Sequence, residues 1–135
     1  MKQYCTFKIE EEIFAIDVNS IQEIINLPRL TKIPRSKGFI TGMFTLRGQI
    51  VTNYCINTLF QMKNTSSCQH CIVIKKNDDP ISMNVNEVLD IIDVELEQIE
   101  ACPEVISENI KQYLEGIIKM GNKIITLLNI EKINE

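Results

Sequence analysis

Hydrophobic and polar residues alternate with a period of two over much of the chain, the pattern of β-strands with one buried face. Near the start, Cys5, Phe7 and Ile9 alternate with polar residues. Strands are expected at residues 5–9, 13–17, 18–25, 71–74 and 81–93. Short strands separated by turns favour a mainly β fold built as a barrel or a sandwich.

The most distinctive stretch is residues 42–52, in which two apolar segments flank an Arg47-Gly48 step. Two extended segments joined by a tight turn fit this pattern, because glycine adopts positive φ without steric cost. The stretch recurs 74 residues later at residues 116–126, where the turn reads Gly-Asn. We therefore predict a β-hairpin at each place. Four glycines are expected as structural turn residues: Gly42, Gly48, Gly116 and Gly121.

A second pair of segments supports an internal repeat. Residues 18–25 align with residues 85–92, which lie 67 positions further along. An internal repeat indicates that a chain is built from two similar structural units. The alternative is that the two segments resemble each other by chance, because β-strands rich in isoleucine have similar composition. We divide the chain into a first β-barrel half, residues 1–66, and a second, residues 67–135. The polar segment at residues 61–69 is the boundary, and strands or a C-terminal helix can cross it.

Composition and charge narrow the classes of function. The chain has 135 residues, 44% of them hydrophobic, and a net charge of −4. No segment approaches the roughly 20 apolar residues of a membrane helix, and no signal peptide is recognisable, so a cytoplasmic location is expected. A negative net charge does not attract the phosphate backbone of nucleic acids. The expected partners are therefore proteins.

The only spacing that suggests metal or redox chemistry is Cys68-Gln69-His70-Cys71. A structural zinc site needs four ligands, and His70 is the only histidine in the chain. A redox motif belongs at a helix start after a strand, whereas this one precedes a strand. We therefore expect no catalytic residue, metal or cofactor, and we expect the five cysteines to be mostly buried or neutral thiols.

Two charged residues stand within apolar strands, Glu23 and Arg47. Alternation places Ile21 and Glu23 on one face of their strand, so a carboxylate shares a surface with an aliphatic side chain. A charge at the apolar centre of an interface is a common recognition device. The alternatives are that Glu23 is solvated and that Arg47 pairs within the protein.

The loop between Pro28 and Pro34, with the residues after it, is locally basic. Its cations are Arg29, Lys32, Arg35 and Lys37. A basic loop on an acidic protein is usually solvated surface, but it could also meet an acidic patch of a partner.

Several short segments, spread in order over nearly the whole chain, together resemble one known family. They are residues 7–9, 14–17, 21–24, 33–34, 42–51, 85–88, 113–116 and 128–133. In order and spacing they resemble the CheW coupling proteins of bacterial chemotaxis. The resemblance implies two small SH3-like five-stranded β-barrel subdomains packed together, with short helices, in a single CheW-like domain.

The same resemblance implies a non-enzymatic adaptor. Such an adaptor joins the cytoplasmic tip of methyl-accepting chemoreceptors to the regulatory domain of the histidine kinase CheA. By position, Glu23 and Arg47 match polar residues of the family's motifs, and Ile21 matches the adjoining apolar contact surface. These three residues are the partner-binding candidates.

The sequence departs from the family's usual pattern at several positions. Thr45 replaces the usual Asn, Thr52 the usual Pro, and Cys55 the usual Asp, while Ser82 and Asn86 replace the usual Gly and Asp. We interpret the chain as a divergent member of the family, whose partner could be a specialised receptor or kinase array rather than a general one. The alternative from another class is a small β-barrel that binds single-stranded nucleic acid, although 6% aromatic residues and a negative charge suit it poorly.

Overall fold

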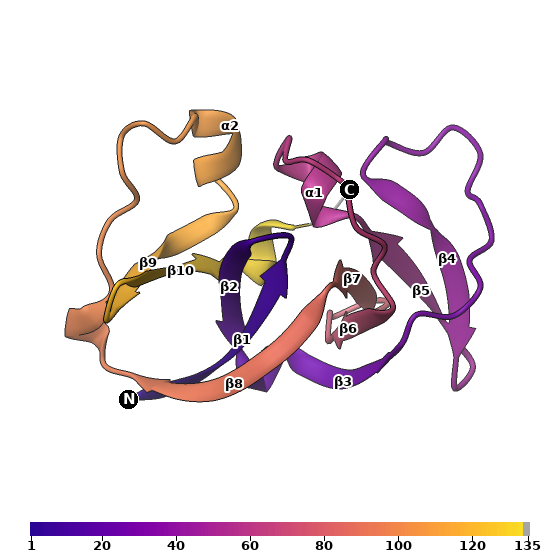
Figure 1. Ribbon diagram of the computed structural model, residues 1–135. Coiled ribbons are helices and arrows are strands. Elements are labelled where there is room, and N and C mark those ends of the chain that lie inside the picture. Colours follow the sequence, from indigo (N-terminus) through magenta and orange to yellow (C-terminus); the bar gives the residue numbers. More distant parts are fainter. Residues whose placement is uncertain (134–135) are drawn as a thin grey trace. The chain divides into compact units, whose positions relative to one another are not determined.

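The computed structural model describes residues 1–133, and its chain divides into two compact units. Unit 1 combines Met1–Asn19 with the chain from Val88 onward, and unit 2 is Ser20–Glu87. Each unit contains a five-stranded sheet (Figure 1). The predicted mainly β fold with short helices is confirmed.

The sheet of unit 1 has the strand order β8-β1-β2-β10-β9. Its strands are β1 (Lys2–Ile9), β2 (Glu12–Asp17), β8 (Glu87–Val94), β9 (Leu114–Met120) and β10 (Lys123–Leu128). The β1–β2 and β9–β10 pairs are antiparallel, whereas β2 and β10 run parallel. Unit 1 also contains three short helices. Two lie between β8 and β9, namely η2 (Leu96–Gln98) and α2 (Glu108–Lys111), and η3 (Ile130–Lys132) comes after β10.

The sheet of unit 2 has the strand order β3-β6-β7-β5-β4. Its strands are β3 (Ile21–Asn26), β4 (Ile40–Leu46), β5 (Gln49–Tyr54), β6 (His70–Ile74) and β7 (Ile81–Val85). Here β5 and β7 form the parallel pair. The helices are α1 (Ile56–Leu59) and η1 (Val18–Ser20), where the chain passes from unit 1 into unit 2.

The two sheets have one topology, but they do not coincide with the predicted halves. Residues 1–66 supply β1 and β2 to unit 1 and β3, β4 and β5 to unit 2. Residues 67–135 supply β6 and β7 to unit 2 and β8, β9 and β10 to unit 1. The repeated strand order is therefore present along the sequence, while each compact unit is assembled from both halves. The reason is that β2 pairs with β10 and β3 pairs with β6, contacts that alternation along the chain does not specify.

Both predicted hairpins are present, but two of the four glycines have another role. Gly48 and Gly121 lie in the turns with positive φ, whereas Gly42 and Gly116 lie within β4 and β9. A Cβ on Gly42 would stand 2.8 Å from the Thr31 carbonyl oxygen. A Cβ on Gly116 would stand 2.5 Å from the carbonyl oxygen of Glu100. These two glycines permit close approach of another segment of backbone.

The segments that approach Gly42 and Gly116 are extensions of the opposite sheet edge. Thr31, beyond the end of β3, exchanges two backbone hydrogen bonds of 2.8 Å with Met43 of β4. In unit 1, Glu100 lies beyond the end of β8 and exchanges bonds of 2.8 and 2.9 Å with Ile117 of β9. Each sheet thus curls so that chain leaving one edge strand bonds to the other edge strand, as expected of an SH3-like arrangement.

Hydrophobic side chains of each sheet form the core of its unit. In unit 1 the cluster contains Tyr4, Ala15, Val94, Ile118, Ile125 and Leu127. In unit 2 it contains Phe44, Val51, Cys71 and Val73. Thr6 is buried although alternation predicts it at the surface, because its hydroxyl bonds both the N–H and the C=O of Asp90, each at 2.9 Å. In residues 1–133 no helix is both long and apolar enough to cross a membrane.

Candidate functional site

The predicted site residues Glu23 and Arg47 contact each other. Glu23 lies on β3, and Arg47 lies in the turn between β4 and β5. A guanidinium nitrogen of Arg47 donates to the Glu23 carboxylate in an ion pair. The Arg47 side chain remains 71% exposed, whereas that of Glu23 is 22% exposed. The pairing within the protein that was one alternative for Arg47 therefore occurs, and it occurs at the surface.

Arg47 adopts an unfavourable backbone conformation to occupy this turn. Its φ is 49°, and that of Gly48 is 83°, so both central residues of the hairpin turn are left-handed. The corresponding residue of the other hairpin is Gly121, with φ of 64°. A residue with a Cβ pays roughly 1–2 kcal/mol for this conformation, which glycine tolerates. The turn geometry therefore does not require arginine, and the contact with Glu23 is what the side chain adds.

Ile21 is the third predicted site residue. It begins β3, pairs with Ile74 of β6, and is half-buried like Glu23. The register of β3 shifts between Ile21 and Glu23, so the strand is bulged there. The alternation in burial nevertheless continues through the bulge, and Ile21 and Glu23 share the half-buried side of the strand.

Two exposed isoleucines of unit 2 stand close in sequence to the ion pair, and the sequence analysis missed them. Ile24 on β3 is 43% exposed, and Ile50 on β5 is 50% exposed. The repeat relates them to Ile91 on β8, 61% exposed, and Ile124 on β10, 55% exposed. Each unit thus presents an isoleucine from its edge strand and one from its hairpin. The repeat alignment contains this signal, since all four positions are isoleucine.

The Cys68-Gln69-His70-Cys71 segment does not form a shared site. Cys71 is buried in the core of unit 2, and burial raises the pKa of its thiol to about 11, although a hydrogen bond with Ser82 acts in the opposite direction. Cys68 and His70 are half-buried. Among residues 1–133, no group of three or more His, Cys, Asp and Glu side chains is placed to hold a metal ion. Cys5 and Cys55 are also buried, in agreement with the expectation of mostly buried thiols.

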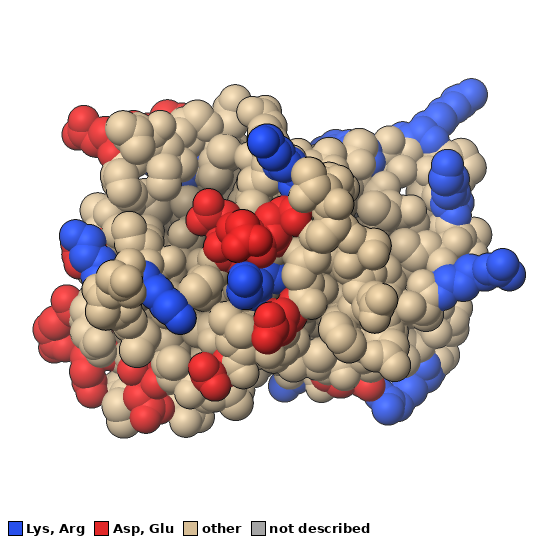
Figure 2. All heavy atoms as spheres, viewed as in Figure 1, with Lys and Arg blue, Asp and Glu red and all other residues tan. Residues whose placement is uncertain are grey.

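Charge is divided unequally between the two units. Residues 20–87 carry eight Lys and Arg against four Asp and Glu, whereas the rest of the chain carries six against fourteen. Unit 2 therefore has a formal charge of +4 and unit 1 a charge of −8. On the face shown in Figure 2, most red side chains lie on unit 1, with some blue ones among them, and the charged side chains that project from unit 2 are mainly blue. The net charge of the whole chain conceals this difference.

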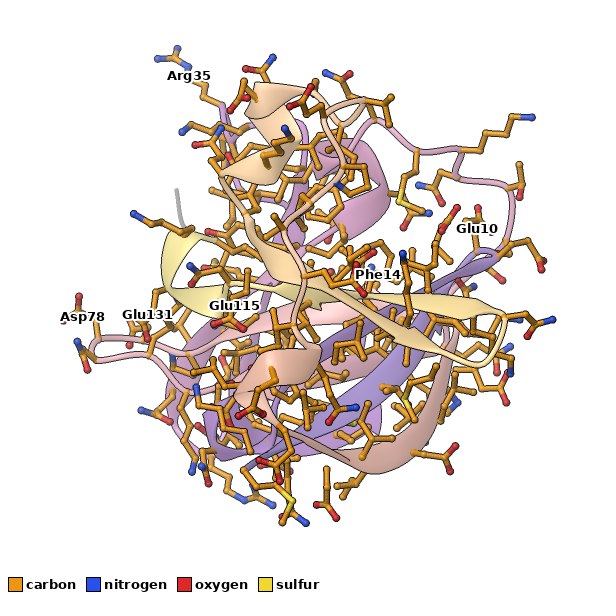
Figure 3. All side chains as sticks on the ribbon, turned by 90° about the vertical axis from the view of Figure 1, so that its left-hand side faces the viewer. Glu10, Phe14, Arg35, Asp78, Glu115 and Glu131 are labelled. Carbon is orange, nitrogen blue, oxygen red and sulfur yellow. The ribbon has the colours of Figure 1, made fainter. Side chains whose placement is uncertain are left out.

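The predicted basic loop contributes to the charge of unit 2. Arg29, Lys32, Arg35 and Lys37 are all exposed. The Arg35 side chain projects away from the ribbon in Figure 3. The Lys37 ammonium lies 5.9 Å from the centre of the Phe39 ring, within the range of a cation–π contact. This loop is a solvated cationic surface.

Comparison with known proteins identifies the family of this chain. The sequence model described as the CheW-like domain matches residues 3–135. The chain belongs to the CheW-like domain family. It is 28% identical over 134 residues to the chemotaxis protein CheW of Klebsiella aerogenes, with 98% of this chain and 81% of that protein covered. It is 25% identical over 131 residues to the chemotaxis protein CheW of Thermotoga maritima, with 96% and 85% covered.

A solved structure supports the fold of this CheW-like domain. The scaffolding protein TtCheW from Thermoanaerobacter tengcongensis superimposes with a TM-score of 0.84 at 24% identity. The match covers 94% of this chain and 88% of that one. The arrangement of two five-stranded sheets with short helices is therefore that of a CheW protein.

The structure shows the surroundings of two residues that depart from the usual CheW pattern, Cys55 and Ser82. Cys55 stands at the N-cap of α1 and makes no side-chain capping bond, a bond that the family's usual Asp is suited to make. Ser82 accepts a 2.7 Å hydrogen bond from the buried amide of Asn53. Asn53 also donates to Asn84 at 2.9 Å and accepts from the Thr41 hydroxyl. A buried polar network thus joins three strands of unit 2.

Proposed function

We propose that this CheW-like domain is a non-enzymatic adaptor that couples chemoreceptors to the histidine kinase CheA in bacterial chemotaxis. Its partners would be the regulatory domain of the kinase and the cytoplasmic tip of a methyl-accepting receptor, and its location would be cytoplasmic. Membership of the CheW-like family supports the adaptor class. The observation that carries the proposal is the exposed ion pair of Arg47 and Glu23, next in sequence to exposed aliphatic side chains.

The features of this surface are those of a protein interface. Exposed aliphatic side chains supply apolar area that a partner can bury. A charged group within such an area gives specificity, because a wrong partner leaves the charge desolvated without a counterpart. Arg47 has donors beyond the one that binds Glu23, since a guanidinium carries five N–H groups. In this proposal Glu23 orients Arg47, and Arg47 binds a carboxylate or carbonyl groups of the partner.

An adaptor needs two contact surfaces, and the repeat supplies a basis for two. Ile24 and Ile50 belong to unit 2, and the equivalent Ile91 and Ile124 belong to unit 1. Only unit 2 has an arginine in its hairpin turn. The two surfaces would therefore share an apolar character and differ in charge, which allows different partners to bind. Coupling then requires that the receptor's signalling state changes the contacts made with the bound kinase.

Binding to single-stranded nucleic acid has less support. Unit 2 is basic, but a single-strand site also needs exposed aromatic rings on which bases stack. Of the aromatic residues in unit 2, Phe44, Tyr54 and Phe60 are buried, and Phe39 is half-buried beside Tyr54. The described surface of unit 2 therefore lacks the stacking platform that this function requires.

The proposal is tested by titrating the CheA regulatory domain and a receptor-tip fragment from the same host into the protein. We expect both to bind, and Arg47→Ala to weaken at least one complex by about tenfold, as expected when an interface arginine is lost. Lys32→Ala removes an exposed cation of the basic loop and serves as the matched control. Wild-type affinities for Arg47→Ala would remove the interface role, and no binding by the wild-type protein would overturn the adaptor function.

A further inference from the structure

Unit 1 contains a groove that the proposed adaptor surface does not use. Its volume is about 660 Å³, within the range of small-molecule and peptide sites. The walls are mainly apolar and come from the start of β1, the end of β8, η2 and the start of β9. Its apolar lining includes Tyr4, Val94, Leu96, Ile99 and Leu114. Leu96 is 81% exposed, so a large apolar side chain stands at the groove without a cover.

An acidic group marks one position in this apolar lining. The Tyr4 hydroxyl donates a hydrogen bond of 3.2 Å to the Glu115 carboxylate. Tyr4 lines the groove but is only 1% exposed, so its ring is buried and does not offer apolar surface to a ligand. Burial, with a smaller contribution from Glu115, raises the pKa of Tyr4 to about 12, so the hydroxyl stays protonated and remains a donor. Glu115 is exposed at the start of β9, on the side of unit 1 that faces the viewer in Figure 3.

The charges around the groove favour a cationic occupant. No salt bridge within residues 1–133 involves Glu115. Lys2 also lines the groove, and its ammonium is already paired with Asp17 at 3.6 Å. Unit 1 as a whole has a formal charge of −8. An anion would therefore be repelled from this groove, and a neutral apolar group would leave the carboxylate unpaired.

We propose that the groove of unit 1 binds a protein segment in which an apolar side chain adjoins a lysine or arginine. The apolar side chain packs against Leu96, Ile99 and Leu114, and the cation pairs with Glu115. An arginine fits best, because its planar guanidinium can donate two parallel hydrogen bonds to the carboxylate. This site lies in unit 1, so it is independent of the Glu23 and Arg47 surface and of the proposed function built on it.

The test uses short capped peptides as probes and amide NMR shifts as the readout. The probe is acetyl-Leu-Arg-amide, compared with acetyl-Leu-Gln-amide, which lacks the cation, and acetyl-Gly-Arg-amide, which lacks the apolar side chain. We expect millimolar affinity, because so few atoms make contact. The arginine probe should bind about two- to fivefold tighter than its glutamine counterpart, the range of an exposed ion pair. Shifts should concentrate at residues 96–99 and 114–115.

Two variants assign the two parts of the site. Glu115→Gln should abolish the preference for arginine over glutamine and leave binding of the glutamine probe unchanged. Leu96→Ser should weaken binding of both leucine probes, whereas Val105→Ser, which removes another highly exposed aliphatic side chain, one outside the groove, should not. Both positions are exposed, so folding is expected to persist, and the amide spectrum itself reports it.

Three results would overturn the inference. The first is no localised shift with about 10 mM probe, an affinity too weak to be specific. The second is equal binding of the arginine and glutamine probes, which removes the role of Glu115. The third is a set of shifts centred outside the groove, which would move the site elsewhere. None of these results bears on binding of the kinase or receptor at unit 2.

Discussion

The Glu23 carboxylate on β3 forms an ion pair with the guanidinium of Arg47 in the β4–β5 turn. The two residues are 24 positions apart in sequence, and the pair links an edge strand to the tip of a hairpin. An exposed pair of this kind contributes about 0–1 kcal/mol to folding. The pair therefore contributes little to stability, and in the proposed function it positions Arg47 for recognition of a partner.

Replacing Arg47 by glycine should separate stability from binding. Glycine relieves the left-handed conformation of a residue with a Cβ, so Arg47→Gly should leave the free energy of unfolding unchanged or raise it by up to about 1 kcal/mol. Binding of the kinase regulatory domain or the receptor tip should nevertheless fall about tenfold. Denaturant unfolding and calorimetric titration measure the two effects. A large loss of stability would instead assign Arg47 a structural role.

Substituting the glycines within β4 and β9 should be costly. Gly42→Ala and Gly116→Ala each place a Cβ within 2.8 Å of a carbonyl oxygen, so the backbone bonds of Thr31 and Glu100 must break or shift. We expect each to lower the free energy of unfolding by roughly 2 kcal/mol or more, as overpacking with lost hydrogen bonds does. Gly38→Ala is the control, since its nearest new neighbour would be 4.0 Å away. Equal stabilities of all three variants in urea would contradict the close-approach role.

The buried amide of Asn53 should be important for unit 2. Its partners are Thr41, Ser82 and Asn84, on both neighbouring strands. Asn53→Ala should lower the free energy of unfolding by about 2–4 kcal/mol, because several buried polar groups lose their partner at once. Asn86→Ala, which removes a hydrogen bond to Ser66 at an exposed site, should change it by less than about 0.5 kcal/mol. Thermal or chemical unfolding of the two variants compares the buried network with the exposed hydrogen bond.

Tyr4 should make the protein sensitive to alkaline pH. Its pKa is raised from 10.0 to about 12 by burial, then by Glu115. Between these values the unfolded chain has lost the proton and the folded chain retains it, so stability falls as pH rises. The wild-type protein should therefore lose stability more steeply above pH 10 than Tyr4→Phe, and both should behave alike at lower pH. Unfolding midpoints across this range give the comparison, and parallel curves would show that Tyr4 is not responsible.

Local features of the fold could be predicted from the sequence, because they depend on neighbouring residues. The alternation around Phe7 and the turn at Gly48 specify strands and hairpins directly. The role of Gly42 could not be predicted, since the carbonyl it accommodates belongs to Thr31 on a separate segment. For the same reason the division into halves was expected at residues 61–69, whereas pairing of β2 with β10 places both ends of the chain in unit 1.

The candidate site shows the same limit. Glu23 and Arg47 stood out separately as charges in apolar strands, but nothing in the sequence indicated that they contact each other. Ile24 and Ile50 looked like ordinary strand residues, because composition does not tell which face of a strand is covered. Their exposure depends on the packing of unit 2. The signal in the sequence is that isoleucine recurs at the equivalent positions of the repeat, 91 and 124. The partner-binding role of Ile21, Glu23 and Arg47 stays a prediction.

Each sheet contains strands from both halves of the sequence, so pairing between strands holds the two halves together. A cut in the polar segment at residues 61–69 would leave each sheet still containing strands from both fragments. In unit 1 the pairings of β1 with β8 and of β2 with β10 would join the fragments, and in unit 2 the pairings of β3 with β6 and of β5 with β7 would do so. Neither fragment alone contains a complete sheet. The two halves of the sequence are therefore arranged as two fragments that complete each other's sheets, and the covalent connection at that segment keeps them in a one-to-one ratio.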